Sequence, residues 1–282
     1  MRHLLVPTDF SESAGKAIDF AVHTAALIDA EITLLHSFEL RDNMYVDYLG
    51  LTREFNQDML ADAKKRLEEQ AAKLPDSISA DTLIAKSSIQ ESIAETAAAK
   101  ATDLIVMGTM GAGKIEGKLW GSRTASVIGK TKVPVMAIPH EYSWKPPQRM
   151  LLATKTFKKD KAILDYVFKL AQFYKAGVKA AVYSATEDPQ SETFRQNQKD
   201  LEAYGQFLET NYPESADGIE HLKGSRFEEA VEGFIKAEQM DILTMVTYQN
   251  GFWESLFNPS KTKEMSFHTK IPLLAIPASF EG

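Results

Sequence analysis

The residues best suited to chemistry form a glycine-spaced segment that ends at Gly121-Ser122. The segment starts with Gly108-Thr109-Met110-Gly111, and nine residues separate Gly111 from Gly121. Glycine has no Cβ and tolerates positive φ, so its backbone can approach a ligand closely. The start of a helix presents unpaired N–H groups and a positive dipole end, which suit phosphate. The spacing Gly-x2-Gly-x9-Gly-Ser therefore predicts a phosphate-binding loop, in which Ser122 caps the following helix, binds a phosphate oxygen, or does both.

Further polar residues stand at the ends of two apolar runs. Pro7-Thr8-Asp9 follows the first run, and Asp9 either binds a ligand or caps the helix that follows it. His36 ends the second run and is either a core histidine or a ligand. The basic residues of the glycine segment either steer phosphate or are solvated charges; they are Lys114, Lys118 and Arg123.

Other nucleotide-binding and catalytic motifs are either incomplete or absent, which disfavours the activities that depend on them. Gly108-x4-Gly113-Lys114 imitates the start of a P-loop, but Ile115 stands where the magnesium-binding hydroxyl is required. The sequence has no Gly-x-Gly-x-x-Gly after its first strand, no Gly-x-Ser-x-Gly and no His-Glu-x-x-His. Its six histidines are scattered and form no metal-binding pattern. No general base or nucleophile is visible, so the sequence indicates ligand binding or, at most, slow hydrolysis.

The elements that position these residues alternate between short apolar runs and longer amphipathic stretches. The runs predict strands at His3–Pro7, Ile32–His36, Thr82–Ala85, Leu104–Gly108 and Val133–Pro139. The stretches predict helices near Ser13–Ile28, Arg53–Leu74, Ile89–Ala101 and Ser122–Lys130. Nearly continuous Val, Ile and Leu runs are typical of parallel strands buried on both faces, and the alternation predicts an open parallel sheet with flanking helices. Ligands of such sheets bind beyond the carboxyl ends of the strands, at the topological switch point.

The same pattern occurs twice in the chain. Residues 86–139 align without a gap on residues 224–277, and Arg2-His3-Leu4-Leu5-Val6 aligns with Arg149-Met150-Leu151-Leu152-Ala153. Phe10 then corresponds to Phe157. The repeat predicts two domains, 1–139 and 149–282, joined by a proline-containing linker at 140–148.

Composition sets the broad class of the protein. Its 282 residues exceed the usual size of a single domain, and the net charge of -7 disfavours non-specific binding to nucleic acid or to an anionic membrane. There is no cysteine, which excludes disulfides, thiol catalysis and cysteine-ligated zinc. We expect no signal peptide and no membrane span, and a cytoplasmic location.

Together these motifs resemble the universal stress protein family in its ATP-binding form. The resemblance rests on the Gly-x2-Gly-x9-Gly-Ser spacing, on Val6-Pro7-Thr8-Asp9-Phe10-Ser11 and on Leu34-Leu35-His36. It covers both halves of the chain, but the full set of motifs is present only in the first. It implies two tandem Rossmann-like domains of the adenine nucleotide alpha hydrolase type, each with about five strands and flanking helices.

The resemblance also implies roles for single residues. Pro7, Thr8 and Asp9 would lie against adenine and ribose, and the backbone at Ser37 would bind the adenine edge. Met107 and Gly108 would line the nucleoside. Gly111, Gly121, Ser122 and the backbone of Arg123 would hold the phosphates of ATP, ADP or AMP, and Mg²⁺ would bridge those phosphates.

In the second half this site is degenerate. The alignment replaces Gly108 by Val246, Gly111 by Gln249 and Gly121 by Pro259, while Asp9 corresponds to Thr156. Side chains at the glycine positions and a proline without an N–H oppose phosphate binding. The aromatic segment 251–257 either plugs the lost cleft or forms a surface for a partner.

We expect the two halves to form an intramolecular pseudo-dimer, in which Val133–Pro139 pairs with Ile271–Pro277; a homodimer is also possible. The leading hypothesis is a stress-response or signalling module that binds one adenine nucleotide per chain and controls an unknown protein partner. The alternatives are an interaction protein with a vestigial site and a slow ATPase.

Overall fold

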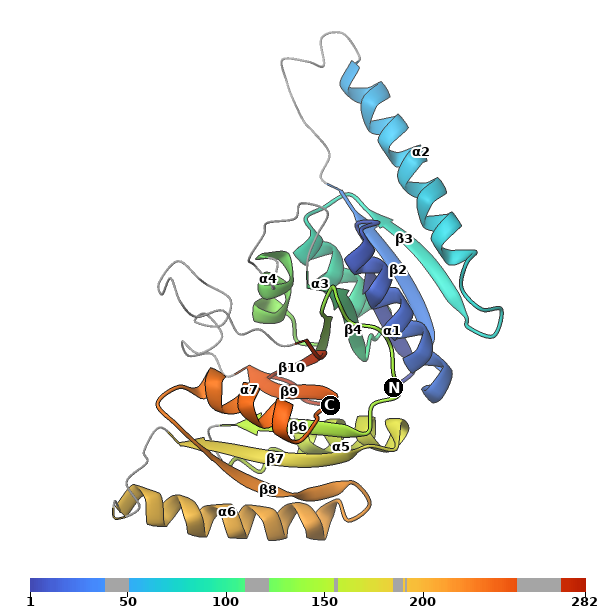
Figure 1. Cartoon of the computed structure of the whole chain (residues 1–282). Helices are drawn as coiled ribbons and strands as arrows, with labels where there is room; N and C mark the ends of the chain where they lie inside the picture. Colours follow the sequence, from blue (N-terminus) through green and yellow to red (C-terminus); the bar gives the residue numbers. More distant parts are fainter. Residues whose placement is uncertain (39–50, 110–121, 155–156, 185–189, 191, 248–269) are drawn as a thin grey trace. The chain divides into compact units, whose positions relative to one another are not determined.

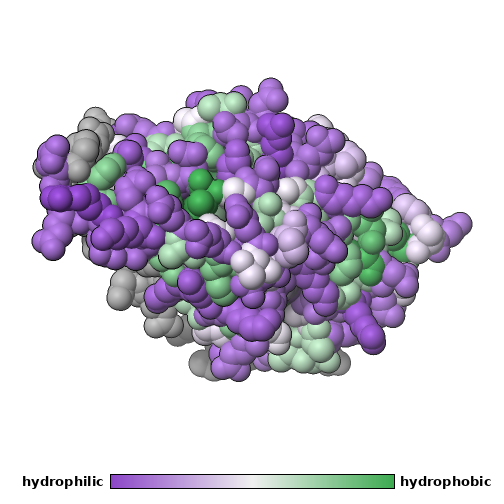
Figure 2. All heavy atoms as spheres, turned by 90° about the horizontal axis from the view of Figure 1, so that it is seen from below, coloured by the Kyte–Doolittle hydropathy of each residue, from purple (hydrophilic) through white to green (hydrophobic). Residues whose placement is uncertain are grey.

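The computed structural model describes residues 1–38, 51–109, 122–154, 157–184, 190, 192–247 and 270–282. The chain divides into two compact units, Met1–His140 and Glu141–Gly282 (Figure 1). No helix in the described ranges is long and apolar enough to cross a membrane. Figure 2 shows one face of the molecule, where hydrophilic residues predominate and hydrophobic ones form smaller groups between them.

The first unit is a five-stranded parallel sheet with helices between successive strands. The strands are β1 (His3–Pro7), β2 (Glu31–Ser37), β3 (Ala80–Ala85), β4 (Leu104–Gly108) and β5 (Val135–Ile138), and the helices are α1 (Glu12–Ile28), α2 (Leu51–Ala71), α3 (Ile89–Ala99) and α4 (Ser122–Lys130). The strand order is β3-β2-β1-β4-β5. The predicted α/β alternation is confirmed, with β1, β4 and α4 at their predicted bounds and the other elements within a few residues of theirs.

The apolar runs form the centre of this sheet because they are buried on both faces. The side chains of Leu4, Leu5 and Val6 in β1 are fully buried, and so are those of residues 104–106 in β4. Right-handed crossovers place α1 and α2 on one face and α3 and α4 on the other. Accordingly, α1 packs on β1 and β4, whereas α3 packs on β1, β2 and α4.

The second unit has the same connectivity. Its strands are β6 (Arg149–Thr154), β7 (Gly177–Ser184), β8 (Ala216–Lys223), β9 (Ile242–Thr247) and β10 (Leu273–Pro277), and its helices are α5 (Lys161–Tyr174), α6 (Glu192–Asn211) and α7 (Phe227–Ala237). The parallel order is β10-β9-β6-β7-β8. The first strand of this unit, β6, therefore lies between the second and the fourth, as β1 does in the first unit.

An aspartate before the fourth strand anchors the start of the first strand in both units. The Oδ2 atom of Asp103 accepts hydrogen bonds from the N–H groups of Arg2 (2.6 Å) and His3 (3.1 Å). The Oδ2 atom of Asp241 accepts from the N–H groups of Gln148 (2.9 Å) and Arg149 (3.1 Å). The two bonds satisfy backbone donors that precede the ladder, so this aspartate fixes how the first and fourth strands meet.

The strand register corrects the predicted alignment of the two first strands by one residue. Leu4 pairs with Leu104 in one unit, and Met150 pairs with Ile242 in the other. Leu4 therefore corresponds to Met150, and not to Leu151 as the sequence suggested. The later alignment agrees with the register, because Gly108 pairs with Ile138 as Val246 pairs with Ile276. The error arose because consecutive apolar residues look alike when both faces of a strand are buried.

His3 is a buried histidine at the start of β1. Its Nδ1 atom lies 2.9 Å from Oγ1 of Thr102, and its Nε2 atom lies 2.8 Å from Oγ1 of Thr33. Burial lowers the pKa of His3 below its usual range, and the nearby Lys100 charge lowers it further. The folded first unit thus favours the neutral imidazole, whereas the unfolded chain takes up a proton near pH 6.5.

We predict that the first unit loses stability as the pH falls below about 6.5, because the unfolded state then binds a proton that the folded state resists. The His3→Gln variant should flatten this dependence by up to about 1.4 kcal/mol per pH unit, the limit for one proton. Urea unfolding at a series of pH values measures the effect. His23→Gln is the control, since the His23 side chain is 45% exposed on α1. Equal pH dependence in wild type and His3→Gln would contradict the prediction.

Candidate functional site

The switch point of the first sheet lies between β1 and β4, because the chain runs outward from β1 to β2 and β3, then returns to β4 and β5. Five of the predicted site residues lie at or just beyond the ends of these two strands: Pro7, Thr8, Asp9, Met107 and Gly108. Ser37 ends the neighbouring strand β2. The fold therefore brings these six positions to one edge of the sheet.

Thr8 is held by β2, by α2 and by a bond within its own turn. Its N–H donates to the carbonyl of Leu35 (2.8 Å), and its carbonyl accepts from Nδ1 of His36 (2.8 Å). Its hydroxyl donates to Oε1 of Gln70 in α2 (3.1 Å) and accepts from the N–H of Phe10 (3.1 Å). Thr8 is 4% exposed, so its polar groups position the turn after β1.

Asp9 does not cap α1. Ser11 does so, because its Oγ atom accepts from the N–H of Ala14 (3.2 Å). The Oδ1 atom of Asp9 instead accepts from the N–H of Ser11 (3.1 Å), which fixes the carboxylate within the turn. Phe10, between them, has a φ of 63°, a conformation that costs a non-glycine residue roughly 1–2 kcal/mol. Such strain is commonly retained at functional sites.

The first turn of α4 contacts the turn after β1 and the end of β4. Nη1 of Arg123 lies 3.8 Å from Oδ2 of Asp9. The hydroxyl of Thr124 donates to the carbonyl of Gly108 (2.9 Å), the last residue of β4. The start of α4 is therefore attached to the strand ends through side chains of consecutive residues.

Gly108 is required by packing within the protein. A Cβ at this position would clash with Oγ of Ser13, in the first turn of α1, and would lie 2.6 Å from the carbonyl oxygen of that residue. The sequence suggested that the missing side chain makes room for a ligand. The structure shows that it makes room for α1, which approaches the end of β4 at backbone distance.

A row of rings and one guanidinium lies beside the turn after β1. The ring of Phe10 is 4.5 Å from that of His36, which is 6.4 Å from that of Phe38. The guanidinium of Arg66, in α2, lies 4.2 Å from the centre of the Phe10 ring. Sequence analysis named His36 but missed the α2 residues Arg66 and Gln70, since no local motif marks them and only the packing of α2 brings them to the strand ends.

The remaining predicted residues are Met107, Ser122 and residues of the glycine segment before α4. Met107 is 6% exposed, so its side chain belongs to the core. Ser122 begins α4, and the description of this residue is confined to its backbone. Four predicted residues lie outside the described ranges: Gly111, Lys114, Lys118 and Gly121.

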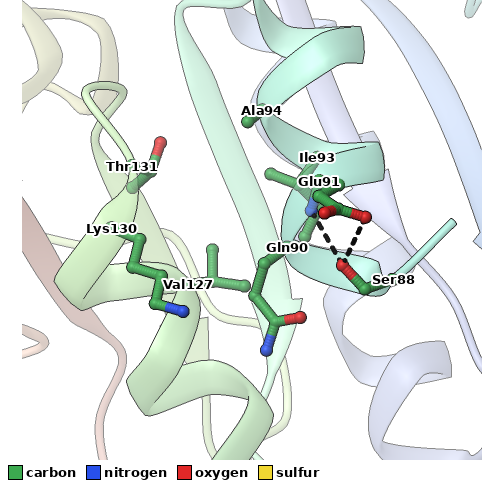
Figure 3. A pocket seen from close by; sticks show the side chains of 8 residues that line it. All are labelled: Ser88, Gln90, Glu91, Ile93, Ala94, Val127, Lys130 and Thr131. Carbon is green, nitrogen blue, oxygen red and sulfur yellow. Dashed lines mark hydrogen bonds between the residues drawn. The ribbon is translucent and has the colours of Figure 1, made fainter.

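A cavity of about 290 Å³ lies between α3 and α4 (Figure 3). Ile93 and Val127 form its buried part, and Gln90 and Lys130 face it from the two helices. It is near the lower limit for a small-molecule pocket and none of its lining residues is a predicted site residue. We therefore place the candidate site at the ends of β1 and β4. Within the described ranges, no three His, Asp or Glu residues are grouped so as to hold a metal ion.

Comparison with known proteins identifies the family of the first domain. The family model described as "Universal stress protein family" matches residues 1–139. A universal stress protein of Methanocaldococcus jannaschii is 27% identical over 157 residues, which cover 50% of this chain and 97% of that protein. The chain belongs to the universal stress protein family through its first 139 residues.

Solved structures extend the likeness in fold to the whole chain. A universal stress protein from Archaeoglobus fulgidus is 18% identical with a TM-score of 0.68, and the match covers 98% of both chains. A putative universal stress protein from Pseudomonas aeruginosa is 15% identical with a TM-score of 0.62, covering 99% of this chain and 94% of that one. At these identities the likeness shows the fold alone.

We predict that Gly108→Ala destabilises the universal stress domain by roughly 1–3 kcal/mol, because the added methyl group meets the backbone of Ser13. Gly129→Ala is the matched control: its Cβ would meet nothing within 4 Å, so the substitution in α4 should be neutral or stabilise by up to about 1 kcal/mol. Urea unfolding followed by circular dichroism compares them. Equal stability of Gly108→Ala and wild type would show that α1 does not need this close approach.

Proposed function

We propose that residues 1–139 bind an adenine nucleotide where β1 and β4 end, and that the protein is a stress-response module whose nucleotide state controls a partner. The observation that carries the proposal is the meeting of Asp9 with the first turn of α4 at the switch point, with Arg123 at 3.8 Å and Thr124 bonded to Gly108. Asp9 is a hydrogen-bond acceptor suited to a nucleoside, and the start of α4 suits phosphate. Membership of the universal stress protein family supports the same assignment.

In this proposal the nucleoside lies against Pro7, Thr8 and Asp9, with the backbone at Ser37 at the adenine edge and with Met107 and Gly108 beside it. Gly111, Gly121, Ser122 and the backbone of Arg123 hold the phosphates of ATP, ADP or AMP. Mg²⁺ would bridge the phosphates without a dedicated set of protein ligands. The lack of cysteine is consistent with the cytoplasmic location that we include in the proposal.

We propose further that each chain has one such site. The register places Val246, which has a side chain, at the position of Gly108. Because β6 is offset by one residue while Phe157 still corresponds to Phe10, the counterpart of Asp9 is Lys155 or Thr156, and neither is a carboxylate. Tyr204 of α6 is 2% exposed and its ring lies 6.1 Å from that of Phe157, so an aromatic pair stands where Arg66 meets Phe10 in the first unit.

The domain limits 1–139 and 149–282, with residues 140–148 as the linker, are part of this proposal. So is the intramolecular pseudo-dimer, in which the last strands of the two domains would cover each other's edges. An experimental structure with these strands apart would contradict the pseudo-dimer and leave the nucleotide site unaffected.

We predict that denaturing freshly purified protein releases about one adenine nucleotide per chain, identified by liquid chromatography; protein that loses the nucleotide should bind one equivalent on titration with ATP and Mg²⁺. Gly121→Val should abolish binding, because a branched side chain would occupy the phosphate position. Gly129→Ala lies in α4, the helix that follows Gly121, and should bind the nucleotide like wild type, since its Cβ has free space. Saturation at two nucleotides per chain would refute the single site, and failure of both release and titration would refute nucleotide binding.

A further inference from the structure

The two carboxylate oxygens of Asp9 have different partners. Oδ1 accepts the hydrogen bond from the N–H of Ser11 at 3.1 Å. Oδ2 lies 3.8 Å from Nη1 of Arg123. A nucleoside that hydrogen-bonds to the Oδ2 atom of Asp9 therefore competes there with Arg123.

The two partners differ in how firmly they are held. Asp9 has a side-chain exposure of 26% and is fixed by the turn, whereas the Arg123 side chain is 66% exposed on a long flexible stem. At 3.8 Å and with this exposure the ion pair is a weak one. A ligand can therefore displace the guanidinium from Asp9 at little cost in free energy.

The backbone at Arg123 is held in place by the neighbouring residue of α4. Because Thr124 bonds to the carbonyl of Gly108, the first turn of the helix is tied to β4, and any rearrangement at Arg123 is confined to its side chain. Arginine stays charged at all physiological pH values and forms paired hydrogen bonds with phosphate oxygens. From one position its guanidinium can serve either the carboxylate or a phosphate bound at the start of α4.

We propose that the Arg123 side chain is a specificity determinant that selects phosphorylated nucleotides over free nucleosides by exchanging Asp9 for phosphate. The inference rests on the proposed function and adds to it a role for this side chain. Adenosine must displace Arg123 from Asp9 and offers the cation nothing in return. ATP displaces it in the same way, but its phosphates then receive the guanidinium. Arg123 thus weakens adenosine binding and strengthens ATP binding.

The test is to measure the affinities of ATP and adenosine by calorimetry for wild type and Arg123→Gln. The variant should bind ATP about tenfold more weakly, as expected for loss of a charge-assisted contact with phosphate. It should bind adenosine equally or up to about fivefold more tightly, because Arg123 no longer competes with the ligand for Asp9. The ratio of the two affinities should therefore fall at least tenfold.

Two variants isolate this effect. Lys130→Gln removes one positive charge from the last turn of the same helix but leaves Arg123 beside Asp9. It should leave the ratio of the two affinities unchanged, because the loss of one positive charge elsewhere on the helix does not affect the exchange. Arg123→Lys keeps the charge without the fork of donors and should restore part of the ATP affinity. Circular dichroism confirms that each variant is folded, and a merely structural ion pair would change both affinities together.

The outcomes separate the two proposals. If wild type binds ATP and adenosine but Arg123→Gln leaves their ratio unchanged, the exchange is refuted and the nucleotide site stands. If Lys130→Gln lowers the ratio as much as Arg123→Gln does, the selection is general electrostatics and the role of Arg123 is refuted. If wild type binds neither ligand, the proposed function fails and this inference fails with it.

Discussion

The close approach of α1 to the end of β4 constrains the described part of the candidate site. Only the absence of a Cβ at Gly108 allows the first turn of α1 to lie at backbone distance, where Ser13 would otherwise clash. With the start of α1 fixed there, the turn between β1 and α1 has little freedom, and Phe10 adopts a positive φ within it. Asp9 is held in this turn and meets Arg123. A packing constraint thus positions the residues proposed to bind ligand.

The two units share their framework and differ at the carboxyl ends of the strands. Asp103 and Asp241 anchor equivalent first strands, and both sheets have the same connectivity. At the switch point the first unit has Gly108, where the second has Val246. The aspartate anchors and the buried apolar strands are present in both units, so the second unit can keep the fold although it has a different residue at the end of its fourth strand.

The proposed nucleotide site combines an acceptor held in a turn with a cation on an exposed side chain. Asp9 belongs to the rigid turn, while the exposed side chain of Arg123 extends from a helix whose backbone is tied to β4. Weak pairing between the two suits exchange, because a strong buried pair would resist displacement by any ligand.

The sequence by itself determined the parallel α/β fold, the connectivity of the first unit and the grouping of Pro7–Asp9 with Met107 and Gly108, because apolar runs and glycine spacing are local patterns with direct structural meanings. It did not determine the contacts of Arg66 and Gln70 with the turn after β1, the Asp9–Arg123 pair or the reason for Gly108. Nor did it determine the register of β6. These depend on residues far apart in the chain, and only the packing of helices on the sheet decides which of them meet.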